Sequence, residues 1–174
     1  MAEVDLPSGA SPVEDAIQVQ FLDPLAEATT VAFREVAATD VFLDTVCHTA
    51  RPIHFGERSA MIELSFPSGT GVLVLSTTAT AAATLAGRVL AGQDLDVDAF
   101  LIDDCLGEIA NVIAGQGKAM LAETDRHYVF GTPRVASGLA CGVFLGGRSG
   151  WFVLSFQCDL GLIFLQVSEV TPAK

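Results

Sequence analysis

Residues 104–111 read Asp-Cys-Leu-Gly-Glu-Ile-Ala-Asn and contain two patterns at helical spacing. Polar or small residues recur at positions 104, 108, 111 and 115, so a helix places them on one ridge. The opposite face carries an apolar stripe: Leu101, Cys105, Ile109, Val112 and Ile113. This stripe predicts that the helix packs against a core. Gly107 and Gly115 each weaken a helix by about 1 kcal/mol relative to Ala, which indicates a requirement other than helix stability.

The length and composition indicate one domain of ordinary size. The chain has 174 residues, of which 51% are hydrophobic and 17% charged, and this is enough for a real core. We expect a flexible N-terminal tail over residues 1–18 and a single domain over residues 19–174. No apolar run approaches the roughly 20 residues of a membrane span, and the acidic N-terminus is unlike a secretory signal. A cytoplasmic location is therefore predicted.

Charge and cysteine usage exclude several classes of function. The net charge of −12 argues against nucleic acid or an anionic membrane as partner. The cysteines lack C-x-x-C spacing and read as small buried residues: Cys47, Cys105, Cys141 and Cys158. Cys47, His48 and His54 match no common zinc spacing. Residues 115–118 (Gly-Gln-Gly-Lys) lack the first Gly and the Ser or Thr of a P-loop.

Periodicity along the chain predicts two halves of similar order. The first half is a helix over about 25–46, then strands near 51–55, 59–66 and 71–76. A short helix over about 79–91, with Thr77 or Thr78 as N-cap, leads to the long helix with the ridge. The second half continues with strands at 133–137, 140–145, 151–156 and 162–168. We therefore expect an α+β domain in which long helices pack on a mostly antiparallel sheet.

The last three predicted strands are almost uncharged. An apolar strand left at a sheet edge is prone to pair with another chain. This pattern favours a homodimer formed through sheet edges.

The ridge is followed by a rigid turn, Gly131-Thr132-Pro133, and a strand that reaches Gly138. With this context the sequence resembles the chemotaxis phosphatases of the CheX and CheC type. Their signature is Asp or Ser, three residues, Glu, two residues, Asn and, some twenty-odd residues later, Pro. The matching positions here are Asp104, Glu108, Asn111 and Pro133. The likeness extends more loosely from about residue 62 to residue 138.

The resemblance implies a CheC-like fold and hydrolysis of the aspartyl phosphate of a CheY-type response regulator. In the family, the Asn orients the attacking water, a task that suits a neutral amide because it both donates and accepts hydrogen bonds. The Glu contacts the regulator's lysine. These roles fall on Asn111 and Glu108. The residues expected to contact the partner are Asp104, Gly107, Gly115 and Pro133. Mg²⁺ would belong to the regulator, so the chain is expected to need no cofactor of its own.

The first helix provides a comparison within the chain. Val31, Glu35 and Ala38 stand at the three signature positions there, so the amide is missing and one site per chain is expected, as in CheX-like proteins. Two alternatives stay open. One is a non-catalytic CheX-like binding module that docks on a response regulator or switch protein, although the retained Glu–Asn pair argues against it. The other is an unrelated α+β interaction domain in which the motif is a coincidence.

Overall fold

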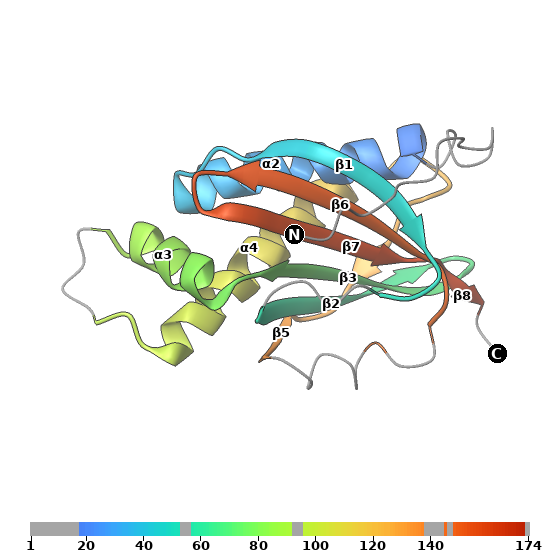
Figure 1. Ribbon diagram of the computed structural model, residues 1–174. Coiled ribbons are helices and arrows are strands. Elements are labelled where there is room, and N and C mark those ends of the chain that lie inside the picture. Colours follow the sequence, from blue (N-terminus) through green and yellow to red (C-terminus); the bar gives the residue numbers. More distant parts are fainter. Residues whose placement is uncertain (1–17, 53–56, 92–95, 138–144, 146–147, 173–174) are drawn as a thin grey trace.

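The computed structural model describes residues 18–52, 57–91, 96–137, 145 and 148–172 (Figure 1). Within these ranges the helices are η1, a π-helix (Gln18–Leu22), α2 (Asp23–Ala37), α3 (Ala79–Val89) and α4 (Ala99–Met120). The strands are β1 (Phe42–Thr49), β2 (Arg58–Phe66), β3 (Gly69–Thr77), β4 (Val129–Phe130), β5 (Arg134–Ser137), β6 (Trp151–Cys158), β7 (Gly161–Ser168) and β8 (Thr171–Pro172). The predicted α+β class is confirmed.

The strands form one sheet whose order is nearly symmetric about its centre. The path is β1-β6-β7-β3-β2-β4, with β5 also paired to β2 and β8 to β3, and all pairings between described strands are antiparallel. The last long strands of the two halves, β3 and β7, meet at the centre. The first strand of each half pairs with the second of the other, β1 with β6 and β5 with β2. This exchange supports the interpretation of the chain as two related halves.

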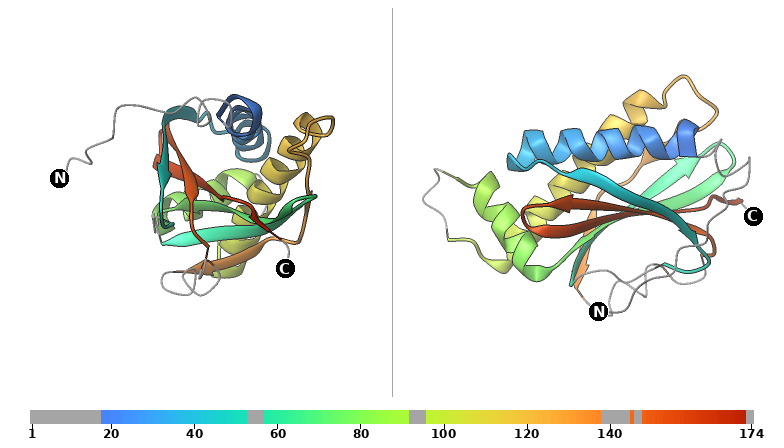
Figure 2. Two further views of the ribbon diagram at one scale, coloured as in Figure 1. Left: turned by 90° about the vertical axis from the view of Figure 1, so that its right-hand side faces the viewer. Right: turned by 45° about the horizontal axis from the view of Figure 1, so that its top comes forward.

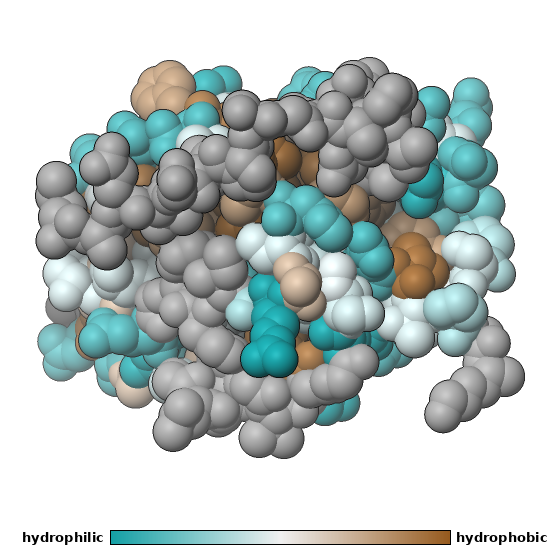
Figure 3. All heavy atoms as spheres, turned by 45° about the vertical axis from the view of Figure 1, so that its right-hand side comes forward, coloured by the Kyte–Doolittle hydropathy of each residue, from teal (hydrophilic) through white to brown (hydrophobic). Residues whose placement is uncertain are grey.

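The helices cover one face of this sheet. Figure 2 shows α2 and α4 on the same side of the sheet, and the two helices contact each other. Fully buried side chains between the two layers include Ala28, Ala32, Phe33, Ile109, Ile113, Leu75, Leu154 and Leu165. A smaller cluster of Met61, Val72, Val74, Leu145 and Trp151 packs separately. On the face seen in Figure 3, the coloured hydrophobic atoms form small areas between polar ones.

The expected helix over 25–46 is wrong in its second half. Helix α2 ends at Ala37, and residues 42–49 form β1, which pairs with β6. The helix ends because Ala38 adopts the left-handed conformation, at φ 46° and ψ 39°, and the N–H of Thr39 bonds to the Phe33 carbonyl at 3.1 Å. Glycine is the usual residue at such an end. With alanine there, the sequence carried no stop signal.

The other elements agree with prediction to different degrees. Strands expected at 59–66, 71–76, 133–137, 151–156 and 162–168 correspond to β2, β3, β5, β6 and β7. Thr78 is the N-cap of α3, and its side chain accepts the Ala81 N–H at 3.1 Å. The two-residue strands β4 and β8 were not predicted. The strands expected near 51–55 and 140–145 fall mainly on residues 53–55 and 140–144, outside the described ranges, as do residues 1–17 of the predicted tail.

The expectation that the almost uncharged last strands lie at a sheet edge is wrong for β6 and β7. β6 and β7 lie inside the sheet, between β1 and β3, so their lack of charge reflects burial. In the described part of the chain, the edges belong to β1 on one side and to β4 and β5 on the other.

Cys47, Cys105 and Cys158 are free thiols, whereas Cys141 lies outside the described residues. Among the helices that the structure describes, none is long and apolar enough to cross a membrane.

Candidate functional site

Helix α4 carries the predicted ridge and is firmly capped at its start. The Asp98 carboxylate accepts the N–H of Leu101 at 2.8 Å, which satisfies one of the free donors of the first turn. A negative charge at this end is also favoured by the helix dipole. Cys105, Ile109 and Ile113 are buried as predicted. The opposite side of α4 is therefore held outward.

An open groove runs between this side of α4 and the segment 130–135. It encloses about 740 Å³ and is lined by Phe100, Asp103, Asp104, Gly107, Glu108, Asn111, Phe130, Gly131, Thr132, Pro133 and Val135. Asp104 and Glu108 are exposed, and Asn111 is half-buried. The groove thus brings together five of the six predicted site residues. The sixth, Gly115, is not part of its lining, and a Cβ there would lie 3.9 Å from Cζ of Phe130.

The outer wall of the groove is fixed to the edge of the sheet. β4 and β5 both pair with β2, and the N–H of Gly131 donates to the Glu63 carbonyl at 3.0 Å. The buried Gly107 faces this wall. A Cβ at Gly107 would lie 3.7 Å from Cβ of Pro133 and 3.6 Å from Cγ2 of Val135. Gly107 therefore lies at the floor of the groove, where an added methyl group would make ordinary van der Waals contact with the wall.

Tyr128 joins the wall to α4 by a contact that the sequence did not predict. Its hydroxyl donates to the Ala114 carbonyl at 2.8 Å, and its ring packs near Phe66 and Phe130, with centroid distances of 5.6 and 6.4 Å. Burial raises the pKa of Tyr128 well above its ordinary value, so the hydroxyl remains a donor. Gly117 leaves the space for this hydroxyl, because a Cβ there would lie 2.6 Å from it.

The groove is acidic at its α4 side. Asp104 and Glu108 have no ion-pair partner among the described residues, whereas Asp103 pairs with Arg58 of β2. Burial, with a smaller contribution from the nearby Asp104 charge, raises the pKa of Cys105 to about 11, so its thiol is neutral near pH 7. The described residues contain no group of three or more His, Cys, Asp or Glu side chains that could hold a metal ion. The arrangement suits hydrogen bonding and charge contacts with a docked partner.

Phe100 is a second residue that sequence reasoning missed. It lies one turn before Asp104, lines the groove and is 74% exposed. The available signal was its spacing, because position 100 continues the ridge by four residues.

Comparisons with known proteins find similarity in structure alone. Neither a protein-family model nor a curated protein matches this chain. A putative chemotaxis protein from Desulfovibrio vulgaris Hildenborough is 22% identical, with TM-score 0.74 over 85% of this chain and 96% of that one. The chemotaxis protein CheX from Desulfovibrio desulfuricans is 20% identical, with TM-score 0.72 over 84% and 97%.

A third structure is the CheX–CheY–BeF₃–Mg²⁺ complex from Borrelia burgdorferi. The matching chain is 16% identical to ours, with TM-score 0.69 over 85% of this chain and 96% of that one. All three matches cover nearly the whole of the compared chain. The chain therefore has the fold of the CheX and CheC-like chemotaxis proteins.

Proposed function

We propose that the chain is a CheX-like phosphatase that hydrolyses the aspartyl phosphate of a CheY-type response regulator. The observation that carries the proposal is the groove, in which Asp104, Glu108 and Asn111 line one side and Pro133 the other. All four signature residues are thus brought to one open site. The CheX fold supports the proposal, because one CheX with this fold was solved together with CheY.

Asn111 is the residue to which we assign the chemistry. Its amide offers both a donor and an acceptor without a charge, so it orients a water molecule in line with the phosphorus atom. The water oxygen forms a bond to phosphorus, the bond to the regulator's carboxylate oxygen breaks, and inorganic phosphate leaves. Positioning dominates such a reaction because phosphoryl transfer needs little covalent help from the protein.

Glu108 lies one turn before Asn111 and supplies the docking charge. Its carboxylate is exposed and has no ion-pair partner among the described residues, so it is available to the regulator's lysine. Asp104, one turn further, adds a second exposed carboxylate. The Mg²⁺ belongs to the regulator in this proposal, and the location is the cytoplasm, as predicted from the sequence.

Replacing Asn111 with Ala tests the mechanism. Phosphate release would be followed with CheY-type regulators from the same genome, with and without the protein. We expect Asn111→Ala to lower the accelerated rate at least about 100-fold, the order found when one oriented polar group is removed. Gln116→Ala is the matched control, because Nε2 of Gln116 faces Oε2 of Glu35 on α2, at 3.4 Å, away from the groove. Equal rates for Asn111→Ala and wild type would refute the assigned role.

The non-catalytic binding module remains the alternative, and the same assay separates it. A protein that binds the regulator but leaves its phosphate lifetime unchanged is a docking module. The exposed, unpaired Glu108 fits both functions, whereas the amide of Asn111 is needed only for hydrolysis.

The proposal also includes a homodimer, with β1 as the pairing edge. Phe42, at the start of β1, is 67% exposed, and Leu43 beside it is 43% exposed. An apolar edge strand of this kind favours pairing with a second copy. Sedimentation velocity would show a dimer for wild type and a monomer for Phe42→Asp, and a monomeric wild type would exclude it.

A further inference from the structure

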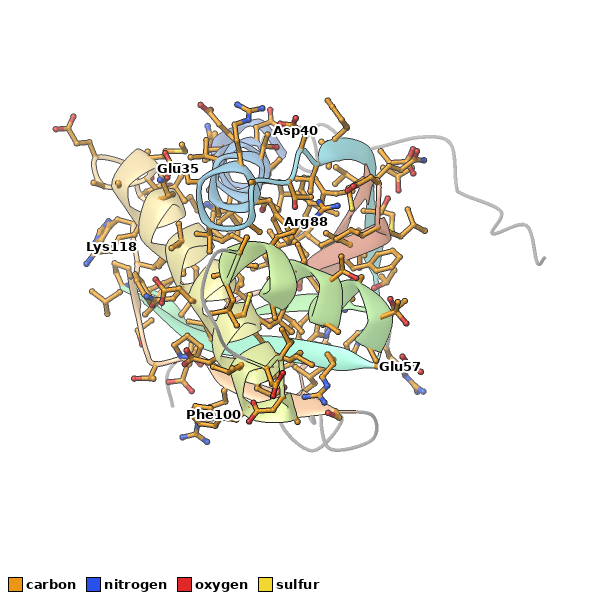
Figure 4. All side chains as sticks on the ribbon, turned by 90° about the vertical axis from the view of Figure 1, so that its left-hand side faces the viewer. Glu35, Asp40, Glu57, Arg88, Phe100 and Lys118 are labelled. Carbon is orange, nitrogen blue, oxygen red and sulfur yellow. The ribbon has the colours of Figure 1, made fainter. Side chains whose placement is uncertain are left out.

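Phe100 is a large aromatic side chain with no role in the core of the described structure. It is 74% exposed, and the neighbouring Val97 is 41% exposed. Figure 4 labels Phe100 and Lys118 near opposite ends of α4. A single exposed apolar residue is normal on a protein surface. Phe100 differs because it lines the groove that holds the candidate site.

The position of Phe100 on α4 extends the ridge. Residues 100, 104, 108 and 111 are separated by four, four and three positions, so they share one face of the helix. At 1.5 Å per residue, Phe100 lies about 16 Å along the helix axis from Asn111. A partner whose reacting group meets Asn111 would therefore meet Phe100 at the margin of the contact area, outside its own active site.

The charges around Phe100 define the chemistry of such a partner. The carboxylates of Asp103, Asp104 and Glu108 line the same groove, and no Lys or Arg is among its lining residues. Arg58 pairs with Asp103, which leaves Asp104 and Glu108 uncompensated within the described residues. The complementary surface is basic and has an apolar depression that accepts a ring.

We propose that Phe100 is a specificity-determining anchor that enters an apolar depression on the response regulator, surrounded by basic side chains and about 16 Å from the phosphorylated carboxylate. The inference rests on the proposed function. Aromatic residues in desolvated pockets often dominate binding energy. Phe100 therefore selects among regulators through the shape of the apolar depression, which lies outside the regulator's phosphorylation site.

Charge argues for a regulator, and against a second copy of this chain, as the occupant. Each copy carries a net charge of −12 and the same acidic ridge. Two such ridges brought face to face would repel each other. A basic protein surface instead gains from contact with Asp104 and Glu108, and this contact weakens as salt screens it.

Binding and turnover measured separately test the inference. The probes are CheY-type regulators from the same genome, loaded with Mg²⁺ and BeF₃⁻ for binding and phosphorylated for turnover. We expect Phe100→Ala to raise the Kd about 10- to 30-fold, from the burial of one aromatic ring, and to change turnover at saturating regulator less than about twofold. Phe100→Leu should recover part of the affinity. Leu162→Ala, which truncates a 45% exposed residue of β7 outside the groove, should change neither value.

The outcomes separate this inference from the proposed function. If Phe100→Ala binds as tightly as wild type while Asn111→Ala loses turnover, the anchor is refuted and the phosphatase stands. If wild type neither binds nor dephosphorylates any of these regulators, both are refuted. If Phe100→Ala instead converts a dimer to a monomer in sedimentation velocity, the occupant is a second copy and the inference is overturned.

Discussion

Gly117→Ala probes the contact that joins the groove wall to α4. A Cβ at this position would lie 2.6 Å from the Tyr128 hydroxyl and 2.7 Å from Cδ2 of Leu25, both closer than carbon contacts allow. Both neighbours are buried in the core. Leu25 is fully buried, and Tyr128 is 2% exposed with its hydroxyl bonded to the Ala114 carbonyl. The substitution therefore forces two core side chains to shift together.

The expected loss of stability follows from three contributions. Overpacking of a core by one methyl group costs about 1 to 3 kcal/mol. Displacement of the Tyr128 hydroxyl from Ala114 costs about 1 kcal/mol more, because the carbonyl is left in a buried site. The higher helix propensity of Ala relative to Gly stabilises the folded state by about 1 kcal/mol. Gly117→Ala should thus lower the free energy of unfolding by about 1 to 3 kcal/mol.

Urea denaturation measures this change, with Gly87→Ala as the matched control. Gly87 lies in α3, and a Cβ there meets no atom within 4 Å. The control should gain up to about 1 kcal/mol from helix propensity alone. Because Tyr128 packs near Phe130 in the wall, Gly117→Ala should also weaken regulator binding. A Gly117→Ala protein as stable as Gly87→Ala would refute the proposed packing.

Three further predictions concern Cys105 and Ala38. Burial raises the pKa of Cys105 from 9.0 to about 11, so the unfolded chain loses this proton at lower pH than the folded one. The free energy of unfolding should therefore fall by roughly 1 to 2 kcal/mol, after allowance for screening, as the pH rises from about 9 to 11. Urea titrations of Cys105→Ala over the same pH range should lack this decrease. Ala38→Gly should raise stability by about 1 kcal/mol in the same assay, because Ala38 has a left-handed conformation. Ala38→Asn should restore no phosphate release to Asn111→Ala.

The fold could be predicted where the signal was local and periodic. The apolar stripe on α4 and the β2–β3 hairpin follow from spacing and turn residues. The end of α2 could not be predicted, because Ala38 stands where glycine would have signalled a stop. The places of β6 and β7 inside the sheet also escaped prediction. Strand order depends on pairing between residues far apart in sequence, such as Cys47 with Val153 and Leu75 with Leu165.

In the candidate site, too, features set by local spacing could be predicted, and those set by contacts between distant segments could not. Asp104, Glu108 and Asn111 were predicted because one helix holds them at fixed spacing. The contact between Gly117 and Tyr128 depends on how the segment after α4 returns to the sheet, which spacing does not reveal. Phe100 was missed because an exposed aromatic residue leaves no pattern in a single sequence, apart from its place on the ridge.

The symmetric order of the strands raises the question of why only one half carries a ridge. Asn111 lies well inside α4, which continues to Met120, whereas Ala38 follows the last residue of α2 and has left the helical path. The side chains around Ala38 also differ from those around Asn111. Arg88 of α3 donates to Oγ1 of Thr39 at 2.7 Å and pairs with Asp159. An amide at position 38 would therefore sit on a helix end that is tied to α3 and the β6–β7 turn. A second site in the first half requires a longer α2, and side-chain replacement alone does not supply it.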